Sequence, residues 1–148
     1  MQIYVVPARW FLFSLLGVIA AAHAWAVINA GYFYVLWLDV LLHFAGGFWL
    51  AAFFIFVLWK KCQEEFPRAP SLSLLVLVSL VSFGGILWEF FEFAYDTLFA
   101  LPSSLPIAQM GQRDTMEDLF LDILGALAAH WFFLKNNREK AESSVQNL

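Results

Sequence analysis

Six acidic residues of this chain lie within or beside apolar stretches long enough to cross a membrane, and no Lys or Arg lies among the buried ones. An ionised side chain at membrane depth costs at least about 2.5 to 3.5 kcal/mol, so carboxylates in such places need a positive partner. We expect that partner to be metal or protons. The six residues are Asp39, Glu89, Glu92, Asp96, Asp118 and Asp122.

Each of three apolar stretches carries its polar residues at helical spacing. The pairs are Asp39 with His43, Glu89 with Glu92, Glu92 with Asp96, and Asp118 with Asp122. Residues three or four apart share one face of a helix. Glycines continue the stripes about one turn deeper, at Gly46-Gly47, Gly84-Gly85 and Gly125, and would let helix backbones approach closely. The sequence therefore predicts a tight bundle beneath a polar pocket.

Carboxylates and imidazoles on facing helices are the ligands that metal sites in helix bundles use. Oxygen-rich ligation with one or two histidines suits Mn, Fe, Mg or Zn better than Cu(I). Several carboxylates could hold two divalent ions about 3.5 to 4 Å apart, with Glu89 or Glu92 as the bridging ligand. The sequence does not identify the metal or a catalytic residue. We predict a divalent metal site formed by Asp39, His43, Glu89, Glu92, Asp118 and Asp122.

Other polar residues near these stretches have two interpretations each. His23, Asp96 and Asp114 are additional candidate ligands, but His23 also fits a hydrogen-bonded core histidine and Asp96 a residue that reaches interfacial water. Asp114 and Glu117 have the spacing of a helix capping box. Arg113 could bind the phosphate or carboxylate of a substrate, or it could simply screen nearby acids.

The composition places this chain among membrane proteins. It has 148 residues, of which 62% are hydrophobic and 14% charged, well outside the range of soluble globular domains. Four apolar stretches have about the 20 residues that a spanning helix needs. We predict an all-α polytopic membrane protein, a four-transmembrane-helix bundle in one domain over residues 1–134, followed by a polar cytoplasmic tail over 135–148. The stretches are Trp10 to Asn29, Leu36 to Trp59, Leu72 to Leu98 and Thr115 to Leu134.

The basic residues predict how the helices are oriented, because Lys and Arg mark the cytoplasmic side of membrane proteins. Seven basic residues lie at one end of the predicted helices, and Arg113 alone lies at the other. We therefore expect both termini to be cytoplasmic and the carboxylates to lie in the outer half of the bilayer. The seven residues are Arg9, Lys60, Lys61, Arg68, Lys135, Arg138 and Lys140.

The chain resembles small bacterial inner-membrane proteins of the YjdF-like and broader VanZ-like groups. The resemblance rests on the pattern Asp39-x-x-x-His43, Trp88-Glu89-x-x-Glu92 and Arg113-Asp114-Thr115-x-x-Asp118-x-x-x-Asp122-x-x-Gly125 and covers roughly Leu36 to Ala129. It implies a multi-pass protein of the bacterial inner (plasma) membrane with acidic and His positions in its helices. VanZ-like proteins are associated with glycopeptide resistance at the cell envelope, but the resemblance implies no settled reaction.

Two functions fit these residues. The first is a metal-dependent hydrolase or transferase that acts at the outer leaflet on a lipid-linked or amphipathic envelope substrate. The second is a cation or proton transporter that uses the same carboxylates, although the inner half offers few polar residues for a pathway. A structural subunit is a third possibility, and the number of carboxylates without a basic partner argues against it.

The expected partners follow from the same features. They are the lipid bilayer and a lipid-linked substrate, and a homo-oligomer is compatible with the sequence. The basic clusters are short and juxtamembrane, so we expect no nucleic-acid binding. The sequence contains no Ser-x-x-Lys or Gly-x-Ser-x-Gly motif of serine hydrolases.

Overall fold

The computed structural model describes residues 6–35, 37–61 and 70–146, with side chains for 6–35, 37–58 and 71–134. Within these residues the chain forms helices and their connections and no strand, so the all-α prediction is confirmed for them. Leu36, Cys62 and Arg68 lie outside the described residues. The elements are α1 (Arg9–Ile28), α2 (Gly31–Tyr34), α3 (Trp37–Lys61), α4 (Pro70–Tyr95), the π-helical turn η1 (Asp96–Ala100), α5 (Leu101–Ser103) and α6 (Gln112–Gln146).

Three helical segments of the described chain are long and apolar enough to cross a membrane. They are Arg9–Ile28, Trp37–Leu58 and Ser71–Ser103, and they coincide with the first three predicted stretches. The third is longer than expected, because the helix continues through η1 and α5 instead of ending near Leu98. Pro102 lies within α5, directly after η1.

The fourth predicted span lies within α6, which differs from the other three in composition. Its apolar part carries Glu117, Asp118 and Asp122 in the first turns, and it is not among the three candidate spans. The backbone stays helical as far as Gln146, so the predicted polar tail continues the helix. α6 makes its most extensive contacts with α3 and also packs against α4.

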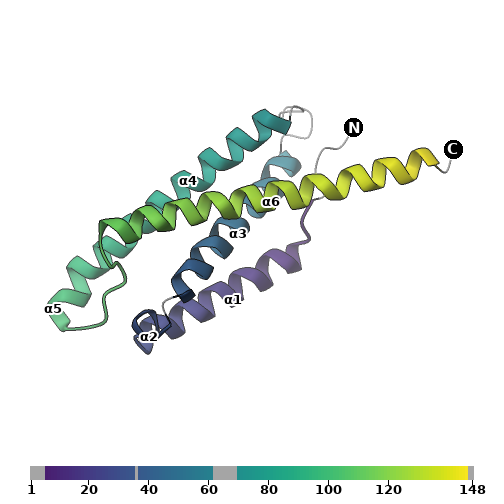
Figure 1. Ribbon diagram of the computed structural model, residues 1–148. Coiled ribbons are helices and arrows are strands. Elements are labelled where there is room, and N and C mark those ends of the chain that lie inside the picture. Colours follow the sequence, from purple (N-terminus) through teal and green to yellow (C-terminus); the bar gives the residue numbers. More distant parts are fainter. Residues whose placement is uncertain (1–5, 36, 62–69, 147–148) are drawn as a thin grey trace.

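The helices run antiparallel in sequence order, so their ends gather at two opposite ends of the bundle (Figure 1). α2, α5 and the first turn of α6 lie at one end, while the start of α1 and the start of α4 lie at the other. Asp39 lies in the first turn of α3 and Glu92 near the end of α4. The polar residues of three helices therefore lie toward the same end of the bundle, in agreement with the prediction that the carboxylates share one half of the bilayer.

Two glycines bring α3 and α6 into direct backbone contact. A Cβ atom on Gly47 would overlap the backbone carbonyl of Asp122, and one on Gly125 would overlap the backbone carbonyl of Phe44. Small residues at a helix interface allow this kind of close approach. The predicted role of these two glycines is confirmed.

The remaining paired glycines have different surroundings. A Cβ atom on Gly85 would overlap the Asp122 carboxylate, and one on Gly84 would overlap the Leu50 side chain. A Cβ atom on Gly46, in contrast, would meet nothing within 4 Å. Gly46 therefore does not serve helix packing, although it was predicted to do so.

An apolar core fills the bundle on the other side of this glycine layer from the acids. It contains several alanines on α3 and α6, which let these two helices pack closely, together with larger side chains. Its buried members are Leu12, Ala51, Ala52, Ile55, Leu77, Val81, Ala126, Ala129 and Phe133.

The contrast between the glycines gives a stability prediction. We expect Gly125→Ala to lower the free energy of unfolding by about 1 to 3 kcal/mol, because the added methyl forces α3 and α6 apart. Gly46→Ala should be neutral or stabilising by about 0.5 to 1 kcal/mol, since Ala is the better helix former and the space is open. Thermal unfolding in detergent measures both, and equal midpoints for the two variants would contradict the proposed backbone contact.

Candidate metal centre

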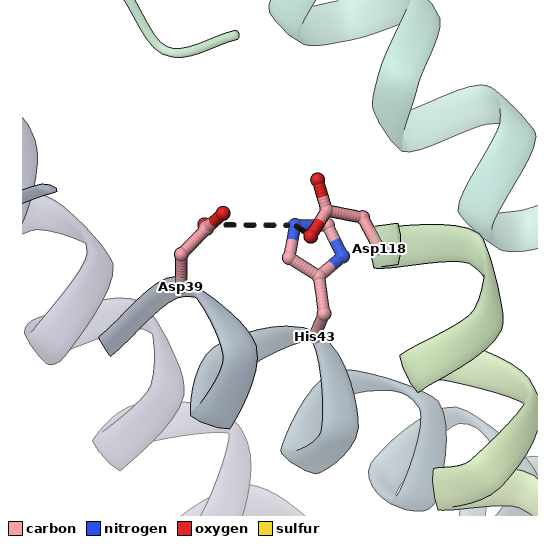
Figure 2. Close-up of side chains that lie close together, drawn as sticks. All are labelled: Asp39, His43 and Asp118. Carbon is pink, nitrogen blue, oxygen red and sulfur yellow. Dashed lines mark ion pairs between the residues drawn. The ribbon is translucent and has the colours of Figure 1, made fainter. Parts of the chain in front are cut away.

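His43 is the centre of the polar cluster. It is buried on α3, and its Nε2 lies 3.8 Å from Asp39 Oδ1 and 3.7 Å from Asp118 Oδ1; Figure 2 shows these three side chains pointing toward one another from α3 and α6. Its Nδ1 lies 3.6 Å from Asp122 Oδ1. All three distances are too long for hydrogen bonds. Ligand atoms around a tetrahedral ion lie about 3.3 to 3.6 Å apart, so a small contraction would bring Nε2 of His43 and the Oδ1 atoms of Asp39 and Asp118 to ligating positions. Asp122 faces the other ring nitrogen, Nδ1, and does not belong to this group.

α4 supplies a second set of carboxylates next to the same imidazole. His43, Glu89 and Glu92 each offer one ligand atom within 4.8 Å of the others, as do Asp39, His43 and Asp118. The two groups share His43 and are buried except for Asp39, which is partly exposed. Side chains from three helices thus converge as the spacing predicted, and they could hold one metal ion or two.

Local packing explains how Asp122 reaches the histidine. Asp118 and Asp122 are one turn apart on α6 and share a face. The Asp122 carboxylate lies against the α4 backbone at Gly85, where any Cβ atom would overlap it. Gly85 therefore provides the space that Asp122 occupies beside His43.

The two glutamates are partly held by neighbouring side chains. Glu89 Oε2 accepts a hydrogen bond from Gln109 Nε2 at 2.9 Å, and Glu92 Oε1 accepts one from Trp88 Nε1 at 3.0 Å. The other oxygen of Glu89, Oε1, is buried and accepts no hydrogen bond from the described residues. A carboxylate held through one oxygen by a second residue is typical of metal ligands.

The loop between α5 and α6 positions Gln109. Asp96 accepts hydrogen bonds from the backbone N–H groups of Ala108 (2.8 Å) and Gln109 (3.0 Å), and the Gln109 side chain also donates to Thr115 Oγ1 at 2.9 Å. Asp96 was predicted as an additional ligand, but both of its carboxylate oxygens accept hydrogen bonds from this loop. Sequence reasoning missed Gln109, since only the fold brings it to Glu89.

The start of α6 differs from the predicted capping box. The helix begins at Gln112, and Asp114 Oδ2 accepts the backbone N–H of Met110 at 2.8 Å. Glu117 instead pairs with Arg113, whose Nε lies 2.7 Å from Glu117 Oε1. This pairing raises the pKa of Arg113. The Arg113 side chain is 92% exposed, and Asp114 belongs to neither of the two groups of ligand atoms described above. Binding of a substrate anion by Arg113 stays a prediction.

His23 lies beside the cluster and has its own partner. Its Nδ1 is 2.6 Å from the hydroxyl of Tyr32, and its ring lies 5.1 Å from that of Trp88, centroid to centroid. Burial raises the pKa of Tyr32 above its ordinary value, so the hydroxyl remains protonated and can donate to His23. The interpretation of His23 as a hydrogen-bonded histidine fits this contact.

A cavity of about 420 Å³ adjoins the cluster, within the usual size range of small-molecule sites. Asp39, His43, Glu92 and Asp122 contribute to its wall, and the rest of its lining is mainly apolar. The other lining residues are Leu16, Ile19, Ala20, His23, Tyr32, Leu42, Gly46, Gly47, Trp49, Leu50, Gly84, Gly85 and Trp88.

Comparisons with known proteins identify a membrane family. A family model described as "Predicted membrane protein (DUF2238)" matches residues 3–139. A protein of Thermotoga maritima with the printed name "Uncharacterized protein" is 40% identical over 89 residues, which cover 59% of this chain and 42% of that protein. The chain therefore matches less than half of the length of this relative. No solved structure matches the chain.

The loop contacts give a second prediction. Asp96→Ala leaves two backbone N–H groups without their acceptor, so we expect a loss of about 1 to 3 kcal/mol in the free energy of unfolding. Asp96→Asn retains one acceptor oxygen and should lose less. The measurement is thermal unfolding in detergent, and wild-type stability of Asp96→Ala would show that Asp96 does not hold the loop.

Proposed function

This chain belongs to the DUF2238 family of predicted membrane proteins, and we propose that its carboxylate and histidine cluster binds one or two divalent metal ions. The proposed ligands are Asp39, His43, Glu89, Glu92, Asp118 and Asp122. The donors are oxygen-rich with a single imidazole, a set that suits Mn, Fe, Mg or Zn.

The unpaired oxygen of Glu89 is the observation that carries this proposal. Glu89 is only 6% exposed and its Oε1 has no hydrogen-bond partner in the described part of the chain. A buried carboxylate oxygen without a partner is costly, and other carboxylates nearby make it more so. A divalent cation between Glu89, Glu92 and His43 would give the buried oxygen a partner and would also reduce the repulsion between the carboxylates.

The proposed membrane arrangement places the cluster in the outer leaflet. α6 would be the fourth span, its acids turned toward α3 and α4 and away from lipid, in a single domain over residues 1–134. The basic residues favour cytoplasmic termini in a bacterial inner membrane. The narrower resemblance to YjdF-like and VanZ-like proteins agrees with a role at the cell envelope.

For the reaction, we propose metal-dependent hydrolysis or group transfer on a lipid-linked or amphipathic substrate. A bound divalent ion lowers the pKa of a coordinated water and neutralises charge that develops on an anionic group. Around it, His43 and the carboxylates would hold the ion, while Gln109 and Trp88 would fix the orientation of Glu89 and Glu92.

Packing beneath the cluster bears on the alternative of cation or proton transport. A transporter needs polar groups that continue across the membrane. The layer below the cluster instead contains the backbone contact at Gly47 and Gly125, followed by the apolar core. Among the described residues deeper than this layer, Ser73 and His130 are the buried polar ones. This arrangement supports a binding site at the outer end more than a pathway.

Metal binding predicts a change in stability that depends on Glu89. At a hundredfold excess over its dissociation constant, a bound ion adds about 2.7 kcal/mol, or roughly 5 to 10 °C in the unfolding midpoint. We expect Mn²⁺ or Zn²⁺ to produce this rise in the wild type and not in Glu89→Gln or Asp118→Asn. In a chelator, Glu89→Gln should unfold at a higher temperature than the wild type, because it removes a negative charge from the cluster.

Glu117→Gln is the matched control, since Glu117 precedes Asp118 on α6 but pairs with Arg113 at the surface. It should keep the metal response. Elemental analysis of the purified protein provides a second measurement. Less than about one tenth of an ion per chain, far below the one or two that the ligands could hold, together with no metal-induced rise in midpoint, would rule out the metal site.

A further inference from the structure

The cavity beside the cluster lies where two helices fail to meet. α1 and α4 each pack against α3, but within the described part of the chain their backbones do not pack against each other. His23 of α1 and Trp88 of α4 make a ring contact across the gap. The remaining space between α1, α3 and α4 is the cavity.

The cavity is elongated along the helix axes. Its lining runs from Leu16 to His23 on α1 and from Asp39 to Leu50 on α3, which at a rise of 1.5 Å per residue corresponds to about 10 Å and about 16 Å. The longer of these is about half of the roughly 30 Å hydrocarbon core of a bilayer. A ligand of this shape would lie parallel to the lipid chains of one leaflet.

Polar and apolar residues are segregated along this length. Asp39, Glu92 and Tyr32 line the end near the cluster, whereas Leu16 and Leu50 line the deep end. A lipid has the same order, with a polar head group followed by a hydrocarbon chain. The cavity therefore matches the polarity of a lipid whose head group lies at the cluster.

The cavity wall is reachable from the surroundings of the bundle. Leu16 is 39% exposed and Trp88 38% exposed, and both belong to helices that qualify as membrane spans. An apolar cavity of this kind does not hold water favourably. In a bilayer, the molecules that surround α1 and α4 are lipids, and a hydrocarbon chain can enter from the side.

Gly46 keeps the cavity open. It lines the cavity, and a Cβ atom there would meet nothing within 4 Å, whereas the adjacent Gly47 is needed for the contact with α6. Helix packing therefore does not explain why this position has no side chain. A larger residue at Gly46 would project into the space without displacing a neighbouring helix.

We propose that this cavity binds the hydrocarbon chain of a lipid whose anionic head group lies at the metal-loaded carboxylate cluster. The placement of the head group rests on the proposed metal function, and the chain site does not. The substrate class is then a lipid with an extended chain and a phosphate in its head group, bound from the outer leaflet, because a phosphate is a group whose charge a divalent ion would bind and neutralise.

The test is photocrosslinking in nanodiscs with phosphatidic acid that carries a diazirine within its acyl chain, followed by mass spectrometry of the labelled residues. We expect selective labelling of cavity residues on α1 and α4. Gly46→Leu should reduce this labelling about tenfold, as expected if two CH₂ groups of the chain are excluded. Gly17→Leu is the matched control, because a Cβ atom at Gly17 also meets nothing within 4 Å and Gly17 does not line the cavity.

A second pair of variants covers the case in which Gly46→Leu does not fold. Ala20→Phe fills the cavity from α1. The adjacent Ala21 is likewise exposed but is not part of the lining, so Ala21→Phe provides the control. Labelling that is spread evenly over the lipid-facing helices and unchanged by the filling variants overturns the proposal. Selective labelling that persists in Glu89→Gln and in chelator, without any metal-induced stabilisation, supports the chain site while refuting the metal site.

Discussion

The backbone contact between α3 and α6 is the constraint on which the polar cluster depends. Gly47 and Gly125 lie about one turn from His43 and Asp122, and they allow the two helices to approach until only hydrogen atoms separate their backbones. At a usual interhelical distance of about 8 to 10 Å, His43 and the aspartates of α6 would lie farther apart. The glycines thus convert a sequence pattern on two helices into one cluster of polar side chains.

The negative charge of the clustered side chains indicates that the close approach of α3 and α6 bears on function as well as on packing. Bringing carboxylates from three helices together around one imidazole raises their mutual repulsion, and burial adds a desolvation cost. A structural interface would pair these groups with Lys or Arg, yet Arg113 is turned to the surface and pairs with Glu117. Within the part of the chain that the structure describes, the imidazole of His43 is the basic group that lies among these acids, and no Lys or Arg side chain pairs with them. A cation from outside the chain, as proposed above, would balance the remaining negative charge.

The sequence predicted the parts of this arrangement that follow from helical periodicity. Asp39 with His43, and Asp118 with Asp122, share helix faces at spacings of four residues, and similar distances from the helix ends implied a common depth. It could not predict the loop in which Asp96 holds Gln109 against Glu89, because that contact joins residues 20 apart through a turn of irregular backbone. Nor could the sequence show that Gly46 and Gly47 have different roles. The direction in which each residue faces depends on where α1 and α6 lie around α3. The continuation of the helix through η1 and α5 to Ser103 was also missed, because the apolar stretch predicted for this span ends at Leu98.

The length of α6 has a mechanical consequence. This helix has 35 residues and is therefore about 52 Å long, whereas the hydrocarbon core of a bilayer is about 30 Å thick; its C-terminal part extends beyond the other helices (Figure 1). From Ala126 to Gln146 the sequence contains neither Gly nor Pro, the residues at which helices most often bend. The charged end of α6 is therefore joined by one segment without a bending residue to the contact with α3 at Gly125, about one turn from Asp122.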